Sequence, residues 1–230
     1  MAPGTSAALR IPVAAALLAA ACARPPAPLA PAGTFVPVSA GEFLAAAART
    51  APGVAALLAI RWSYDDGESP MSGRGAVRLA PPDSLRLDVS LGILGRATLV
   101  LAGDSAWSQP GALVRQVVPN RSLLWAMFGV VWPPEDLSSV ELSRTAERQV
   151  YRVASAGGMV TTLALKGDTL LGATQSRGDR SIGRLDLTRD SAGEVVRAEA
   201  VDLEHGVRFV VAVNRRESGG AFPSEIWRRP

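Results

Sequence analysis

The side chains with the greatest chemical reactivity are few in this chain. Its 230 residues include one cysteine, Cys22, and one histidine, His205, which lies in a Glu-His-Gly turn. Acyl-transfer sites need a nucleophile, a histidine and an orienting partner, and zinc sites need several Cys or His ligands, so parts of both are missing. No phosphate-binding glycine motif follows a strand, and no carboxylates are paired for acid–base work. We therefore expect a solvated His205 and a chain that is not an enzyme and has no metal or cofactor.

The position of Cys22 indicates a different chemistry. One charge, Arg10, precedes an apolar run over residues 11–21, which is too short to span a bilayer, since a span takes roughly 20 residues. A charged start, a short apolar run and small residues before a cleavage point are typical of a secretory signal. Because Cys22 directly follows Leu-Ala-Ala-Ala, the segment resembles a bacterial lipoprotein signal, in which the cysteine becomes the lipidated first residue. The alternative is a plain signal peptide in which Cys22 has no role.

Residues 22–38 are predicted to form a tether. Four prolines within residues 25–31 exclude a helix and favour an extended polyproline conformation. The resemblance to lipoproteins implies three acyl chains on Cys22, which suffice for stable anchoring, and Ala23 in place of aspartate favours the outer membrane. We predict a signal peptide over 1–21, this tether, and a single folded domain over 39–230 that is lipid-anchored at the periplasmic face of the outer membrane.

Composition and charge are those of an ordinary globular protein. The chain is 48% hydrophobic and 20% charged, and its net charge is +3, from 24 basic and 21 acidic residues. The two signs are interspersed along the sequence, whereas phosphate recognition needs clustered positive charge. Nucleic acid is therefore not an expected partner.

The folded part is predicted to be one helix followed by many strands. Residues 39–42, Ser-Ala-Gly-Glu, form a capping box, and an alanine-rich helix follows over 43–50. From residue 57 onward, short alternating segments about 10 residues apart, separated by Gly and Asp turns, indicate a strongly curved antiparallel sheet or incomplete β-barrel. The strands are predicted over 60–64, 75–79, 84–91, 96–102, 113–118, 147–154, 159–165, 169–176, 181–188, 194–203 and 207–214. The predicted fold class is mainly β (α+β).

One segment, residues 120–134, is nearly all apolar and does not alternate. Asn120 or Ser122 could cap a helix over 122–131. This helix would carry four large side chains on one side: Leu123, Leu124, Met127 and Phe128. A helix that is apolar nearly all round must be buried or must cover an apolar surface. We expect it to cover the concave face of the sheet, either as a permanent plug or as a lid over a lipid cavity.

Three motifs carry a family resemblance. They are residues 82–99, which begin Pro-Asp-Ser-Leu-Arg-Leu-Asp-Val, residues 120–133 with Trp125, and residues 222–226, Phe-Pro-Ser-Glu-Ile. They are similar to the third and fourth strands, the short tryptophan-containing helix and the late proline-bearing strand of the LolA/LolB-type lipoprotein carriers. The resemblance spans residues 39–227 and depends on short apolar motifs.

The resemblance implies an apolar cavity on the concave face that binds acyl chains of lipoproteins or lipids, without catalytic residues. The implied partners are the membrane, through lipidated Cys22, and a periplasmic carrier protein. The candidate cavity residues are Trp62, Leu85, Leu87, Val89, Leu99, Leu101, Trp107, Leu123, Leu124, Met127 and Phe128.

A predicted hairpin turn over residues 91–95, Leu-Gly-Ile-Leu-Gly, is apolar where turns normally carry polar residues. The resemblance implies insertion of this tip into a membrane, with Leu91, Ile93 and Leu94 as candidates. The alternative is that the tip packs on the core or on the apolar helix.

The function implied by the resemblance is lipoprotein localisation or outer-membrane biogenesis. One alternative is a structural or assembly lipoprotein of the outer membrane whose core is filled and takes no ligand. The other is a periplasmic sensor of mislocalised lipoproteins, which would need a regulatory partner.

Overall fold

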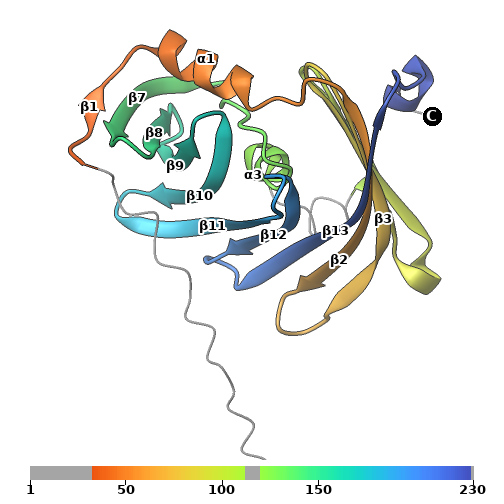
Figure 1. Cartoon of the computed structure of the whole chain (residues 1–230). Coiled ribbons are helices and arrows are strands. Elements are labelled where there is room, and N and C mark those ends of the chain that lie inside the picture. The colour runs from red at the N-terminus through yellow and green to blue at the C-terminus, as the bar shows by residue number, and fades with distance from the viewer. Residues whose placement is uncertain (1–32, 112–119, 229–230) are drawn as a thin grey trace, which may run out of the picture.

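The computed structural model describes residues 33–111 and 120–228 (Figure 1). The predicted signal peptide, Cys22, most of the predicted tether and the predicted strand over 113–118 lie outside these ranges.

The described chain is mainly β-structure, and its strands form one sheet. The helices are α1 (Ala40–Arg49), α3 (Arg121–Ala126) and two short 3-10 helices, η1 (Gly92–Leu94) and η2 (Ser224–Trp227). The strands are β1 (Val36–Pro37), β2 (Ala55–Asp65), β3 (Met71–Ala80), β4 (Ser84–Ser90), β5 (Arg96–Ala102), β6 (Ser105–Gln109), β7 (Leu137–Arg144), β8 (Gln149–Ser155), β9 (Met159–Lys166), β10 (Thr169–Arg177), β11 (Arg180–Arg189), β12 (Val195–Asp202) and β13 (Val207–Gly219).

The sheet follows from alternation of side chains along each strand. In β2, Leu58, Ile60 and Trp62 are buried, whereas Ala59 and Arg61 between them are exposed, so one face is apolar and the other meets water. Cross-strand neighbours share a face, and the same apolar face therefore continues through β3, β4 and β5. One such row runs along paired residues from β2 to β5: Leu58, Val77, Leu87 and Leu99.

Two antiparallel meanders join where β13 pairs with β2. The strand order is β1-β7-β8-β9-β10-β11-β12-β13-β2-β3-β4-β5-β6, which leaves β1 and β6 as the two edges of the sheet. The prediction of a large antiparallel sheet is confirmed, and the sheet is open. The connection from β6 to β7 runs from one edge of the sheet to the neighbour of the other edge, and it contains α3, which lies within the curve of the sheet in Figure 1.

The capping box forms as predicted and begins α1. The backbone N–H of Glu42 donates to Ser39 Oγ over 3.1 Å, so Ser39 is the N-cap. Phe43, Ala46 and Ala47 form the buried side of the helix. The Phe43 ring packs on Tyr151 of β8 with ring centroids 5.5 Å apart, and Figure 1 shows α1 alongside β7.

Three expectations about local structure were wrong. The apolar helix ends at Ala126 and does not reach residue 131, because the chain turns at Gly129, whose φ of 83° is a left-handed value that favours glycine. Residues 137–144 form a strand, β7, that was not predicted. Residues 222–226 do not form a strand; residues 224–227 are the 3-10 helix η2.

Candidate functional site

A cavity of about 830 Å³ lies beside α3 on the apolar side of the sheet. Its volume is within the range of about 300–1,000 Å³ that is usual for small-molecule sites. Apolar side chains from β2, β5, α3 and β13 form one wall: Tyr64, Leu99, Leu101, Leu123, Leu124 and Phe209. The structure therefore brings together four of the predicted cavity residues, two from β5 and two from α3.

Other residues of the lining are polar. It includes Gln175 and Arg177 of β10 and three residues at the turn between β12 and β13, namely Asp202, Glu204 and His205. No local pattern in the sequence identifies these residues as neighbours, because they lie at the ends of different strands. The cavity thus has an apolar wall and a charged rim, as expected of a site for a ligand with an apolar body and a polar end.

His205 and Asp202 form an ion pair at this rim. His205 Nδ1 lies 2.8 Å from Asp202 Oδ2, and the carboxylate also accepts from the backbone N–H groups of Glu204 and His205. The hydrogen bond to Asp202 and its negative charge raise the pKa of His205. Burial acts to raise the pKa of Asp202, but the hydrogen bonds from His205 and Glu204 outweigh it and the pKa is lowered. His205 remains largely exposed, in keeping with the predicted solvated turn.

The remaining candidate residues on the concave face lie outside the cavity lining. Leu85 and Leu87 are fully buried and pair across the strands with Leu101 and Leu99. Val89 is half-buried and packs against the core. Three further predicted residues are buried within the core cluster: Trp62, Met127 and Phe128.

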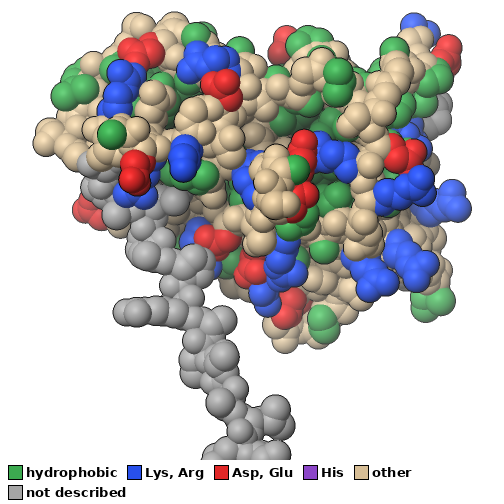
Figure 2. Space-filling view, in the orientation of Figure 1, with side chains coloured by type: hydrophobic (Ala, Val, Ile, Leu, Met, Phe, Trp, Pro, Cys, Tyr) green, Lys and Arg blue, Asp and Glu red, His purple; other side chains and the backbone are tan. Residues whose placement is uncertain are grey.

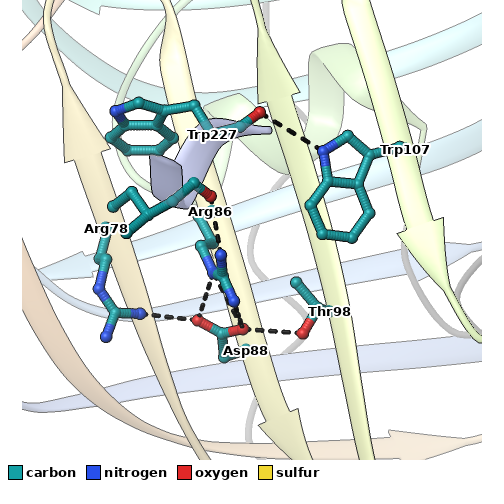
Figure 3. Close-up of polar contacts among 7 residues, drawn as sticks. Arg78, Arg86, Asp88, Thr98, Trp107 and Trp227 are labelled. Atoms are coloured by element: carbon teal, nitrogen blue, oxygen red, sulfur yellow. Dashed lines mark hydrogen bonds and ion pairs between the residues drawn. The ribbon is translucent and has the colours of Figure 1, made fainter. Parts of the chain in front are cut away.

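The prediction that Trp107 lines the cavity was wrong. Trp107 pairs with Val100, whereas its neighbour Ser108 pairs with Leu99 and lines the cavity. Because adjacent residues of a strand point to opposite faces, Trp107 lies on the outer face. There its indole Nε1 donates to the backbone oxygen of Trp227 over 3.5 Å (Figure 3).

The outer face near Trp107 carries a polar cluster that the sequence did not reveal. Asp88 Oδ2 accepts from Arg78 over 2.6 Å and from Arg86 over 2.8 Å, and Thr98 donates to Oδ1 over 2.8 Å. Figure 3 shows these side chains converging on the carboxylate. Burial acts to raise the pKa of Asp88, but the hydrogen bonds from Arg86 and Thr98 and the charges of both arginines outweigh it, so the pKa is lowered. Arg86 also donates to the Ile226 oxygen over 2.7 Å, which holds η2 against β4.

The N-terminal end of α3 is held by Asn120. Its Oδ1 accepts from the backbone N–H of Leu123 over 3.0 Å, and its Nδ2 donates to Gln175 Oε1 over 2.8 Å. Gln175 is a buried polar residue, 3% exposed. The same side chain therefore caps the helix and joins it to β10.

Arg121 joins α3 to two further segments. Its guanidinium donates to the Gly103 oxygen in the β5–β6 turn, and Nη1 lies 3.2 Å from a Glu135 carboxylate oxygen. The guanidinium also lies 4.5 Å from the centroid of the Trp132 ring, which stacks on Trp125 at 5.2 Å. These contacts tie the first residue of the helix to the edge of the sheet.

The chain after α3 is also fixed. The backbone N–H of Val131 donates to Thr50 Oγ1 at the end of α1 over 2.7 Å. Four α3 residues, Leu123 to Ala126, are buried, and a second void near the helix is only about 10 Å³, which is too small for anything beyond a single water molecule. The helix is therefore packed closely on that side, while its Leu123 and Leu124 face the large cavity.

The predicted hairpin tip contains η1. Leu91 is half-buried and packs against the core, whereas Ile93 is fully exposed. The side chain of Leu94 lies outside the described structure. Leu91 thus packs on the core, as in the second alternative for this tip, and Ile93 projects into water.

Two kinds of feature are absent from the described ranges. None of the described helices is long and apolar enough to cross a membrane. Within the same ranges, no group of three or more His, Cys, Asp or Glu residues could hold a metal ion.

Comparison with known proteins identifies the fold. No family model matches the chain, and no curated protein matches its sequence. A solved LolA superfamily protein from Nitrosomonas europaea is similar in structure, with a TM-score of 0.55 and 11% identity over 84% of this chain and 98% of that one. An outer membrane lipoprotein-sorting protein domain from Vibrio parahaemolyticus has a TM-score of 0.49 and 6% identity, over 81% and 94% of the two chains. The chain therefore has the fold of the LolA superfamily, as the sequence motifs predicted.

Proposed function

We propose that this protein binds an acyl chain of a lipoprotein or lipid in the 830 Å³ cavity and functions in lipoprotein localisation or outer-membrane biogenesis. The observation that carries the proposal is the cavity itself, with a wall of leucine and aromatic side chains and a charged rim. The apolar wall suits an alkyl chain, and the rim suits the polar group at which that chain ends.

The energetics favour such a ligand. Removing acyl chain from water gains about 0.8 kcal/mol per methylene. A single long chain would therefore gain on the order of 10 kcal/mol before the cost of ordering it. No catalytic group is needed for this kind of binding, because the gain comes from burial alone.

In this proposal α3 is a fixed wall of the cavity. Its Leu123 and Leu124 already face the empty space, while Asn120, Arg121 and Val131 tie both ends of the segment to the rest of the chain. A ligand can then enter without displacing the helix. Of the two predicted alternatives, a permanent plug or a lid, the helix acts as the permanent plug. It covers the part of the concave face that does not line the cavity.

Attachment to the membrane is the second part of the proposal. Cleavage after residue 21 and lipidation of Cys22 would anchor the chain, and the proline-rich tether to residue 38 would hold the single domain at the periplasmic face of the outer membrane. Ile93, the exposed residue of η1, would enter the bilayer during transfer. A periplasmic carrier protein would deliver the ligand.

A second candidate is a structural or assembly lipoprotein with no ligand. The close packing of α3 favours it, since Trp125 and Met127 are almost fully buried in one continuous core. The two candidates differ in whether the remaining cavity is occupied in function.

A ligand-binding experiment separates them. Full-length protein with Cys22→Ala is mixed with a fluorescent 16-carbon fatty acid, and binding is followed by emission. Gly183 lines the cavity, and a Cβ added there would meet only ordinary contacts, 3.7 Å from Leu123 Cδ1. Gly183→Phe would displace about four methylenes, at ~0.8 kcal/mol each, and so weaken binding about 200-fold.

The matched control is Gly219→Phe in β13, where an added Cβ has open space. This variant is expected to bind like the parent. If the folded parent binds no fatty acid, or if both phenylalanine variants bind equally well, the carrier proposal is wrong and the filled-core candidate remains.

A further inference from the structure

We propose that the cavity takes an amphiphile with an anionic head, a carboxylate or a phosphate, and that Arg177 is the side chain that binds this head. The inference rests on the proposed function and narrows its ligand from any acyl chain to one that ends in a negative charge. Among the charged side chains of the cavity lining, Arg177 alone has no ion pair or hydrogen bond within the described residues.

The register of the sheet places Arg177 at the end of the cavity lining on β10. Gln175 of β10 pairs with Gly183 of β11, and Gly183 pairs with Asp202 of β12, so these three lining residues form one row across the sheet. Arg177 lies two residues beyond Gln175 on the same strand, and side chains two residues apart point to the same face. Gln175 is buried and Arg177 is exposed. The strand therefore carries its cation where the lining passes from buried to exposed residues.

The other charged residues of the lining near Arg177 already have partners. Asp202 lies 2.8 Å from His205 Nδ1 and accepts from two backbone N–H groups. Glu204 lies 3.7 Å from Arg180. Arg180 also lies directly opposite Arg177 across the β10–β11 turn, and like charges at such positions are destabilising. An anion bound to Arg177 would remove that cost.

The carboxylate of Asp202 is separated from Arg177 by the width of β11. The backbones of β10 and β12 are two strand spacings apart, about 10 Å, and the residue between them in the row, Gly183, has no side chain. No carboxylate within the described residues forms an ion pair with Arg177. The cation is thus left open to a ligand in the cavity.

Further carboxylates occur at the same end of the sheet, since Asp65 at the end of β2 and Asp202 at the end of β12 both pair with the first residues of β13. None of these further carboxylates lines the cavity: Asp65, Asp66, Glu68 and Asp179. Two of them, Asp65 and Asp66, accept from backbone N–H groups of their own turn. Figure 2 shows both acidic and basic side chains in the lower middle of the molecule, where β12 and β13 lie in Figure 1. This end has no broad positive surface, so selection of an anion depends on direct contact with Arg177.

The chemistry of arginine identifies the head group. A guanidinium presents a planar fork of N–H donors that matches a carboxylate or a phosphate. An ester- or amide-linked acyl chain offers only carbonyl oxygens, which carry no charge, and an amine would be repelled. Met159, the cross-strand neighbour of Arg177 on β9, also lines the cavity. The cation therefore adjoins apolar surface along which the alkyl chain would lie.

The test compares charged and neutral ligands of equal chain length in two matched pairs. Dodecanoate is compared with methyl dodecanoate, and lauroyl lysophosphatidylglycerol with monolauroylglycerol, which has the same acylglycerol without the phosphate. Full-length protein with Cys22→Ala is titrated with each ligand in a calorimeter. The first pair tests a carboxylate and the second a phosphate, so the two pairs distinguish a free fatty acid from a phospholipid.

The parent is expected to bind the charged member of at least one pair about 10-fold more tightly than the neutral member. This figure takes the lower end of the range for a hydrogen bond to a charged group, because Arg177 is exposed. Arg177→Gln should abolish the preference by weakening binding of the charged ligand and should leave the affinity for the neutral one unchanged. The matched control is Arg61→Gln. Arg61 is an exposed arginine between two buried residues of β2, and it also has no ion pair within the described residues. Because Arg61 lies on the outer face, this variant should keep the preference of the parent.

Three results would overturn the inference: neutral ligands bound at least as tightly as charged ones in both pairs, a preference that survives Arg177→Gln, or an equal loss in the two variants. Urea unfolding checks that each variant is folded, and neither substitution removes an ion pair. Equal binding of charged and neutral ligands by the parent would reject the anionic head and leave acyl-chain binding intact. A folded parent that binds none of the four ligands would reject the proposed function, and this inference with it.

Discussion

Removal of the Asn120 side chain tests whether α3 is a fixed wall of the cavity. Asn120 forms two bonds that α3 depends on, the cap to the Leu123 N–H and the hydrogen bond to Gln175 Oε1. Loss of an N-cap costs about 1 kcal/mol. Loss of the second bond leaves a buried acceptor unpaired, which costs about 1–3 kcal/mol. Asn120→Ala is therefore expected to lower the free energy of unfolding by about 2–4 kcal/mol.

Two further variants separate these contributions. Asn120→Ser keeps a capping oxygen but is too short to reach Gln175, so it should lose only the second bond and cost about 1–3 kcal/mol. Ser39→Ala removes the cap of α1, whose side chain bonds only the Glu42 N–H among the described residues, and it should cost about 1 kcal/mol. It serves as the control for loss of a cap without a buried partner.

The assay is urea unfolding followed by tryptophan fluorescence, to which the stacked Trp125 and Trp132 contribute. In a double-mutant cycle, Gln175→Met should reduce the cost of Asn120→Ser to near zero, because the partner is gone. Equal costs of Asn120→Ser in both backgrounds would show that the bond to Gln175 does not hold the helix. The conclusion that ligand enters without moving α3 would then lose its main support.

Two more perturbations test the sheet around the site. Asp88→Asn should cost about 1.5–3 kcal/mol at neutral pH, since it removes a charged acceptor from Arg78 and Arg86. The folded pKa of Asp88 is lowered, so its stabilisation is complete above the unfolded pKa near 3.9 and is lost as the pH falls through the folded value; acid titration of stability should be flatter in the variant. Gly73→Ala should cost about 1–3 kcal/mol in urea unfolding, because a Cβ there would lie 2.3 Å from the Ser90 oxygen and 2.9 Å from Trp62 Nε1. Unchanged acid stability in the first case, or unchanged unfolding in the second, would contradict these contacts.

The sequence predicted the features that depend on local pattern. The Ser39 cap, the alternating strands of the sheet and the turns between them follow from residues close together in the chain, and the structure has them. The family motifs predicted the fold, although the end of the apolar helix was misplaced. An apolar run has no periodicity that marks where a buried helix stops, and Gly129 was the only local signal.

The sequence of its own strand could not predict on which face of the sheet Trp107 lies. β6 is only five residues long, and its register with β5 decides which residues face the cavity. A shift by one residue would exchange Trp107 and Ser108 between the two faces. The charged part of the lining was hidden for a similar reason, because Arg177 of β10 and Asp202 of β12 line the same cavity only once the sheet has formed.

A fixed helix changes what must control release of a ligand in the proposed carrier. If α3 does not have to open, the affinity for the ligand is not reduced by the low population of an open state of the helix. Binding then depends on the cavity alone. Leaving water gains an acyl chain about 0.8 kcal/mol per methylene, both in a bilayer and in an apolar cavity. The free energy of burying the methylenes therefore changes little when the chain moves from the cavity to the bilayer. The direction of transfer then depends on the polar group at the rim, near Arg177 and Asp202, and on how closely the protein approaches the membrane. The exposed Ile93, which the proposal places in the bilayer during transfer, would set that approach without any change in the cavity.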